Sequence, residues 1–213
     1  MNKYLKATAV VCSLAMGCAT AAEKVNLLAG KVSYAQKCAS CHGGAAEGNL
    51  QIQAPPLASQ DSAYLIRQIV NFKTGRRVAT QADAPAAIMA VVAKTLNNEN
   101  EIRNIASYLS GQQFKSIKSI GRTAETLAAG RALFPVCIGC HSAHGEGTPG
   151  MGAPRIAGMP ESYLATQLRA FKSGARGAHP DDKFGRQMVN IVDSLESEDP
   201  FQSVSAYLAS LAK

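Results

Sequence analysis

Two five-residue stretches of this sequence share one pattern: Cys38-Ala39-Ser40-Cys41-His42 and Cys137-Ile138-Gly139-Cys140-His141. Both are copies of C-x-x-C-H, the motif at which c-type haem is attached. Its two thiols can reach the two vinyl groups on one edge of a porphyrin, and the histidine that follows can place its imidazole on the iron. A thioredoxin-like pair or half of a zinc site is the competing interpretation, but neither needs a histidine after each pair. The motifs therefore predict two covalently bound haem c groups.

The two motifs belong to an internal repeat, because Cys38 and Cys137 are 99 positions apart and the same offset recurs along the chain. The matched pairs are Ala54-Pro55 with Ala153-Pro154, Tyr64-Leu65 with Tyr163-Leu164, Gln68 with Gln167, Phe72-Lys73 with Phe171-Lys172, Arg77 with Arg176, and Tyr108-Leu109 with Tyr207-Leu208. We predict two tandem domains, at residues 23–111 and 124–213. A linker at residues 112–123 is expected where Ser, Gly and Lys replace periodic apolar residues.

The first 22 residues have the layout of a secretory signal. Lys3 and Lys6 precede a short apolar stretch, and small residues offer a cleavage site near Ala22. We therefore predict a signal peptide at residues 1–22 and export to the periplasm. The apolar run is too short for a membrane-spanning helix of roughly 20 residues. Lipoprotein processing at Cys18, which would leave a lipid anchor, is the alternative, although the residues before it fit that pattern poorly.

The composition excludes several classes of protein. With 46% hydrophobic and 17% charged residues, the chain is not disordered, and the lack of a second long apolar run excludes a polytopic membrane protein. The net charge of +7 falls to +5 without Lys3 and Lys6, and to about +1 once the four ionised propionates of two haems are counted. The basic sequence is therefore no evidence of nucleic-acid binding, and we expect none. A charge-paired docking face for redox partners and an ordinary solvated surface both stay open.

The apolar periodicity predicts an all-α fold, with two tandem helical domains that each wrap around one haem. Helices are expected at residues 27–37, 63–73, 85–95 and 99–109 and, before the second motif, at 127–136. Asp61 or Ser62 and Asn97 or Asn98 are candidate caps. Aromatic residues are few and Trp is absent, so the haems should supply much of the apolar packing surface.

The sixth position on each iron decides between an electron carrier and a catalyst. Met89 is the only methionine in residues 23–111, and the offset of 99 pairs it with Met188. A lone methionine usually fills a core, but the pairing predicts that both are axial ligands, opposite His42 and His141. Such ligation fills the iron and raises its reduction potential, which suits electron transfer. The unmatched residues are expected in loops or on the surface: Met151, Met159, His144 and His179.

These features together resemble the dihaem cytochrome c4 family, over residues 25–213. The resemblance rests on the duplicated motif, on A-P-x-x-A at residues 54–58 and on Y-L-x-x-Q-x-x-x-F-K-x-G-x-R at 64–77, each with its copy in the second half. It implies two class I cytochrome c domains with haems close through their propionate edges. It also implies a periplasmic carrier, often membrane-associated, that passes electrons from a quinol-oxidising cytochrome bc complex towards a terminal oxidase.

The resemblance also implies roles for residues around the iron ligands. Pro55 and Pro154 lie 13 residues after their histidines, where a class I cytochrome uses the proline carbonyl to accept from the other ring nitrogen; a plain turn proline is the alternative. Three matched pairs are expected either to hold propionates or to pack on helix faces: Tyr64 and Tyr163, Gln68 and Gln167, and Arg77 and Arg176. The sequence departs from the family at Ser142, where Gly commonly stands, and it lacks a doubled methionine.

Two functions from different classes stay open. The favoured one is a dihaem electron carrier that is not itself an enzyme. The other is a dihaem oxidoreductase or the electron-entry subunit of a periplasmic dehydrogenase or peroxidase, acting for example on peroxide or thiosulfate. Peroxide chemistry needs a vacant or displaceable iron position, whereas each half supplies a matched methionine. A gas-sensing module would need a methionine that leaves on reduction.

Overall fold

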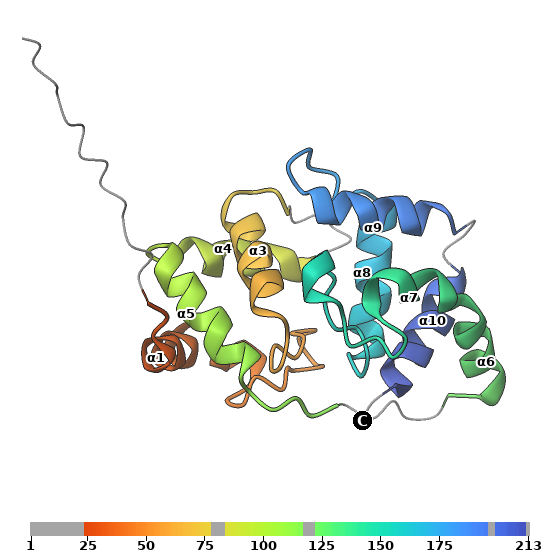
Figure 1. Ribbon diagram of the computed structural model, residues 1–213, viewed down its shortest axis with the longest axis horizontal. Helices are drawn as coiled ribbons and strands as arrows, with labels where there is room; N and C mark the ends of the chain where they lie inside the picture. Colours follow the sequence, from red (N-terminus) through yellow and green to blue (C-terminus); the bar gives the residue numbers. More distant parts are fainter. Residues whose placement is uncertain (1–23, 78–83, 117–121, 196–198, 212–213) are drawn as a thin grey trace, which may run out of the picture.

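The computed structural model describes residues 24–77, 84–116, 122–195 and 199–211, and these residues form an all-α structure of two halves (Figure 1). Apart from helices, turns and loops, the described ranges contain two isolated β-bridges, Asn49 with Ala54 and Thr148 with Ala153. Both bridges sit at the same place in the repeat. The predicted signal peptide, including Cys18, and the middle of the predicted linker lie outside the described residues.

The helices of the N-terminal half are α1 (Leu27–Lys37), α2 (Ala39–His42), α3 (Ser62–Lys73), α4 (Ala84–Lys94) and α5 (Glu99–Ser110). The short α2 was not predicted, and the four other helices agree with the predicted ranges to within one residue at each end. Two candidate caps act as expected: the Asp61 side chain accepts from the Tyr64 N–H, and the Asn98 side chain accepts from the Glu101 N–H. Each bond satisfies an otherwise unpaired N–H in the first helical turn.

The C-terminal half contains α6 (Ala124–Leu133), α7 (Pro135–His141), the 3-10 turn η2 (Pro149–Met151), α8 (Glu161–Lys172), α9 (Lys183–Asp193) and α10 (Asp199–Ser210). The single helix predicted over residues 127–136 is wrong. Helix α6 ends at Leu133, and Pro135 begins a second helix, α7, that carries the haem motif. Proline is suited to a first helical turn, where its missing N–H leaves no bond unmade, but not to a helix interior.

Each half is built on one close helix crossing, α1 over α5 and α6 over α10. A glycine lies at each crossing. A Cβ added at Gly30 would come within 3.0 Å of the backbone of Asn104, and one at Gly130 would do the same at Ser203. Glycine is required here because two helix backbones approach each other directly.

An aromatic pair flanks each crossing and shows where the repeat shifts. Tyr34 packs on Tyr108 with 5.8 Å between ring centroids, and Phe134 packs on Tyr207 at 5.5 Å. Tyr34 and Phe134 are 100 positions apart, whereas the haem motifs are 99 apart, so the second half is one residue shorter between this ring and its motif. The buried Tyr34 hydroxyl donates to the Gly43 carbonyl at 2.5 Å, a bond that Phe134 cannot make.

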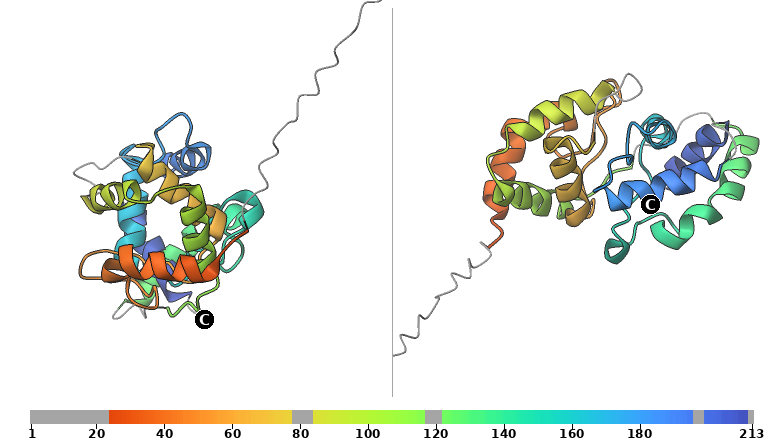
Figure 2. Two further views of the ribbon diagram at one scale, coloured as in Figure 1. Left: turned by 90° about the vertical axis from the view of Figure 1, so that its left-hand side faces the viewer. Right: turned by 90° about the horizontal axis from the view of Figure 1, so that it is seen from above.

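The two halves lie side by side (Figure 2) and exchange hydrogen bonds. The Gln60 side chain pairs with the Arg155 backbone, donating to its carbonyl at 3.0 Å and accepting from its N–H at 2.9 Å. The Arg155 guanidinium donates to the Ala58 carbonyl at 2.7 Å. No helix in the described part of the chain has both the length and the apolar character needed to cross a membrane.

Candidate haem sites

Each half contains a cavity lined by the four residues that the sequence singled out. Cys38, Cys41, His42 and Met89 line the N-terminal cavity, and Cys137, Cys140, His141 and Met188 line the C-terminal cavity. None of these four cysteines forms a disulfide, and burial raises the pKa of the Cys38 and Cys137 thiols to about 11. Among the described residues, no three His, Cys, Asp or Glu side chains cluster as metal ligands do.

The motif histidines are held in one tautomer. His42 Nδ1 lies 2.9 Å from the Pro55 carbonyl oxygen, and His141 Nδ1 lies 2.8 Å from that of Pro154. A carbonyl oxygen can only accept, so Nδ1 carries the proton and the Nε2 lone pair is free to bind a metal. Burial lowers the pKa of both histidines, although the bond to proline opposes that shift, so the neutral imidazole is favoured.

The loop after each histidine has the same course in both halves, despite the exchange of Gly43 for Ser142. Both residues adopt positive φ, 84° for Gly43 and 71° for Ser142. The Ser142 hydroxyl donates to the Glu146 carboxylate at 2.5 Å and accepts from the Glu146 N–H at 3.1 Å. A short polar side chain bonded within its own turn stabilises a conformation that glycine adopts freely. The departure at Ser142 therefore leaves the loop intact.

The two predicted methionine ligands occupy equivalent places. Met89, on α4, packs with Phe72, and Met188, on α9, packs with Phe171. Met159 lies in the loop before α8, as expected, but this loop residue is buried among Phe134 and Leu164. An apolar side chain at this position completes the core of the second half, whereas its counterpart by the offset, Gln60, reaches across to the other half. The three other unmatched residues lie at least partly at the surface: Met151, His144 and His179.

Five of the matched polar residues meet between the halves instead of serving one half each. Arg77 donates to Gln68 at 3.1 Å in its own half and to Gln167 of the other half at 2.6 Å. Arg176 donates to Gln167 at 2.6 Å. It also reaches back across the interface to the Tyr64 hydroxyl and to Gln68, both at 3.0 Å. Spacing within one half could not reveal this, because the bonds join residues about a hundred positions apart.

The same network places positive charge between the two cavities. Tyr64, Gln68 and Gln167 line both cavities, as does Tyr163. Although burial opposes ionisation, the guanidinium groups of Arg176 and Arg77 bring the pKa of Tyr64 below its ordinary value. Buried cations are stable only beside anions.

The residues present therefore fit two haem c groups. Each cavity offers two thiols, an oriented imidazole and a thioether, and the arginines between the cavities would pair with propionates. Two further cavity residues, Arg67 and Arg155, were missed from the sequence. Neither has an arginine at the matching position of the other half, so the repeat gave no signal for them.

Two helical domains that each bring a C-x-x-C-H motif and a methionine to one cavity define a dihaem c-type cytochrome. The Cytochrome c family model matches residues 27–113 and 127–212. The chain belongs to the dihaem cytochrome c4 family.

Two relatives and one solved structure are similar to this chain, and the structure supports the fold. Cytochrome c4 of Pseudomonas aeruginosa is 31% identical over 99% of this chain and 100% of its own length. A thiosulfate dehydrogenase electron acceptor of Stutzerimonas stutzeri is 30% identical over 90% of this chain and 86% of its own length. The crystal structure of reduced cytochrome c4 from Pseudomonas stutzeri matches with a TM-score of 0.71 at 24% identity, covering 88% of this chain and 99% of that chain. The predicted fold class and family are confirmed, and the chain is a dihaem electron carrier that works with redox partners.

Proposed function

We propose that this chain is a periplasmic carrier that takes electrons from a quinol-oxidising cytochrome bc complex and delivers them to a terminal oxidase. The proposed covalent attachment residues are Cys38 and Cys41 for one haem and Cys137 and Cys140 for the other, and the proposed axial ligands are His42 with Met89 and His141 with Met188. The observation that carries this proposal is that both cavities are lined by a matched histidine and methionine.

Haem iron supplies reversible one-electron chemistry. The residues of the chain orient its ligands and influence its reduction potential. The Pro55 and Pro154 carbonyls hold the histidine tautomer, which keeps Nε2 directed for ligation. A thioether from Met89 or Met188 favours ferrous over ferric iron and leaves no position open to oxygen or peroxide. A site that changes oxidation state with little rearrangement is suited to electron transfer.

The shared lining of the two cavities supports passage of electrons within the molecule. Tyr64 and Tyr163, with the two glutamines, border both cavities, so side chains of this network lie between the two sites. The predicted signal peptide supports a periplasmic location. Peripheral attachment to the inner membrane is part of the proposal, since the quinol-oxidising donor is a membrane complex.

A second candidate is a carrier that accepts electrons from a periplasmic dehydrogenase. The relative named as a thiosulfate dehydrogenase electron acceptor favours it, because that protein matches this chain over 90% of its residues. In this alternative the donor is an enzyme that oxidises thiosulfate. The two candidates share both haem sites and differ only in the donor.

The test of ligation is the optical spectrum of the reduced, processed protein with and without carbon monoxide, normalised to haem content. We expect two haems per chain and no change with carbon monoxide. A change amounting to one haem would mean that one site opens to small ligands, and the carrier proposal would fall in favour of an enzyme or sensor. Met89→Ala and Met188→Ala should each let one haem bind carbon monoxide. Met151→Ala, which alters an exposed residue of the same cavity, should leave the spectrum unchanged.

The donor is tested by stopped-flow reduction of the oxidised protein. A detergent-solubilised cytochrome bc complex with quinol, and a thiosulfate dehydrogenase with thiosulfate, are compared at equal concentrations. Fast, saturable reduction by the first supports the respiratory role. Reduction by the second alone would assign the chain to thiosulfate oxidation.

A further inference from the structure

Arg67 belongs to the N-terminal half but reaches the cavity of the C-terminal half. It lies on α3, and its Nη2 donates to the Gly152 carbonyl at 2.6 Å. The guanidinium carbon is 4.1 Å from the ring centroid of Phe184, at the start of α9. Arg67, Gly152 and Phe184 all line the C-terminal cavity, while the residues described around the N-terminal cavity do not include Arg67.

The Arg67 side chain is a cation with an unmet bonding need. Its Nε is buried and has no hydrogen-bond partner among the described residues. Burial lowers the pKa of Arg67, but Tyr64 and Asp182 oppose the shift, so the guanidinium stays charged. The buried Asp182 carboxylate already caps α9 by accepting from the Gly185 N–H at 3.0 Å. A further anion in this cavity would complete the bonding of Arg67.

Arg155 adds a second cation of the same kind to this cavity. Its Nε is also buried without a hydrogen-bond partner among the described residues, and burial lowers the pKa of Arg155 to about 10. Its guanidinium lies 3.4 Å from the ring centroid of Phe114 and bonds the Ala58 carbonyl. Arg155 bonds the N-terminal half through its backbone as well as its guanidinium, whereas Arg67 makes a single hydrogen bond to the C-terminal half, so Arg67 is the better target for substitution.

Neither arginine is repeated in the other half. By the offset of 99, Thr166 is the counterpart of Arg67, and Pro56 is the counterpart of Arg155. Thr166 lines the N-terminal cavity just as Arg67 lines the C-terminal one. Arg67 and Thr166 thus line each other's cavities from matching positions, but only Arg67 carries a charge.

We propose that Arg67 binds a propionate of the haem in the neighbouring C-terminal domain, and that it raises the reduction potential of that haem more than that of the N-terminal haem. The proposal rests on the proposed function only in requiring a haem in each cavity. The physical reason is electrostatic, because a cation held near the porphyrin disfavours the ferric state, which carries one more positive charge. Arg67 acts as a positioning and tuning residue and does not touch the iron.

The test compares Arg67→Met with the unaltered holoprotein in a redox titration followed by NMR. The methyl resonance of each axial methionine reports its own haem, and loss of one resonance in Met188→His assigns the pair. For Arg67→Met we expect about a tenfold shift of the C-terminal haem towards the oxidised form at a fixed potential, which is 59 mV for one electron. The N-terminal haem should shift by much less. Arg67→Lys should retain part of the effect, since it keeps charge but loses the planar fork.

Two further variants keep the proposal falsifiable if Arg67→Met does not fold. Thr166→Arg builds the mirror contact and should raise the potential of the N-terminal haem selectively. Arg103→Gln removes the same charge from the partly exposed face of α5 and should leave both potentials unchanged. Equal shifts of both haems, or none, in folded Arg67→Met would overturn the proposal, as would a Thr166→Arg variant without a selective shift. A haem content below two per unaltered chain would instead refute the proposed function.

Discussion

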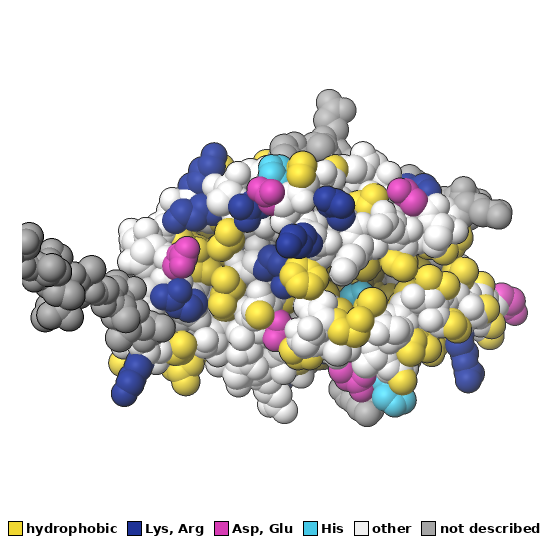
Figure 3. All heavy atoms as spheres, turned by 45° about the horizontal axis from the view of Figure 1, so that its top comes forward, with side chains coloured by type: hydrophobic (Ala, Val, Ile, Leu, Met, Phe, Trp, Pro, Cys, Tyr) yellow, Lys and Arg dark blue, Asp and Glu magenta, His cyan; other side chains and the backbone are white. Residues whose placement is uncertain are grey.

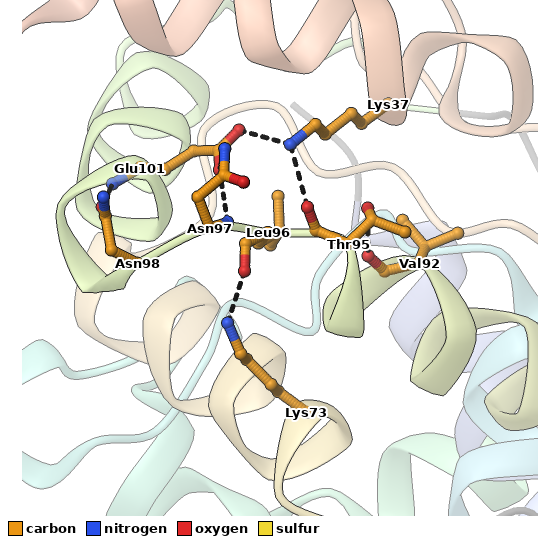
Figure 4. A network of polar contacts seen from close by, with 8 residues as sticks. All are labelled: Lys37, Lys73, Val92, Thr95, Leu96, Asn97, Asn98 and Glu101. Carbon is orange, nitrogen blue, oxygen red and sulfur yellow. Dashed lines mark hydrogen bonds and ion pairs between the residues drawn. The ribbon is translucent and has the colours of Figure 1, made fainter.

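The two halves follow the same backbone course but differ at the edge beside the first cysteine of each motif. In the N-terminal half, Lys37 donates to the Thr95 carbonyl at 3.1 Å and pairs with Glu101 at 2.7 Å (Figure 4). We call these contacts the Lys37 strap. They connect the end of α1 to the segment after α4 and to the first turn of α5. In the C-terminal half the matching positions hold Val136, whose exposed fraction is 48%, and Pro200.

One bond is present in both halves: a lysine at the end of α3 or α8 donates to the segment that follows the helix carrying the methionine. Lys73 donates to the Leu96 carbonyl, and Lys172 donates to the Leu195 carbonyl at 3.2 Å. Exposed apolar side chains border both cavities: Ile88 at the N-terminal one, and Val136, Met151 and Phe184 at the C-terminal one. In Figure 3, apolar side chains gather over this half, while Lys and Arg side chains concentrate nearer the middle of the face. The two halves are therefore alike in the residues that line the cavities and differ in the polar contacts at their edges.

The largest expected effect tests where the halves are alike. Gly30→Ala and Gly130→Ala should each lower the free energy of unfolding by about 3 kcal/mol, because the new Cβ would overlap the backbone of the crossing helix. The measurement is guanidinium unfolding of the holoprotein. Gly44→Ala and Gly150→Ala, where a Cβ meets nothing within 4 Å, are the matched controls. A large loss at one crossing only would show that the halves do not depend equally on this contact.

The next effect tests the one-residue shift of the repeat. Tyr34→Phe removes the hydroxyl bond to the Gly43 carbonyl and should cost about 1 kcal/mol. Phe134→Tyr offers the same hydroxyl to the Ser142 carbonyl of the second half and should gain up to about 1 kcal/mol. Chemical unfolding measures both changes. If Phe134→Tyr destabilises the protein, the shorter connection has moved its ring out of reach of that carbonyl.

The Lys37 strap should make stability depend on pH in the N-terminal half. Burial opposes ionisation of Glu101, but hydrogen bonds from Lys37 and Asn97 bring its pKa below its ordinary value. Its contribution is therefore present above the unfolded pKa of about 4.3 and is lost as the pH falls through the lower folded pKa. Glu101→Gln should lower the free energy of unfolding by about 1 kcal/mol at pH 7. It should have little effect at a pH low enough to protonate the Glu101 carboxyl in both the folded and the unfolded protein.

Hydrogen exchange resolved by peptide shows which half responds to Glu101→Gln. Faster exchange should be confined to α1, α5 and the segment after α4. An equal increase in α6 and α10 would contradict a strap local to the N-terminal half. Lys37→Met should give a similar change, and the double variant should cost less than the sum of the two single variants.

The smallest effect concerns an ion pair at the surface between the halves. Arg76 lies 3.6 Å from Asp181, with exposed fractions of 35% and 63%. The matching position of the other half holds Ala175. Arg76→Ala should therefore change the free energy of unfolding by less than about 0.5 kcal/mol. A loss above about 1 kcal/mol, measured at moderate salt, would mean that surface charge holds the halves together.

Much of the site follows from the sequence because its chemistry is local or repeated. The C-x-x-C-H motif places thiols and imidazole within five residues, and the offset of 99 singles out Met89 and Met188 without knowledge of the fold. Helices such as α1 and α3 were predicted closely, because their periodicity and caps lie within a dozen residues. The burial of the loop residue Met159 was not foreseen, because it depends on packing against distant residues.

Sequence alone determined that this chain has two haem-binding motifs, two helical domains and one matched methionine in each, because these properties are written in short spacings and in the repeat. Only the tertiary structure decided how the halves meet. It placed Arg77 and Arg176 on glutamines of both halves, and it brought Arg67 into the neighbouring cavity. The physical reason is that contacts across an interface depend on the relative placement of two folded bodies, which no spacing within either body records.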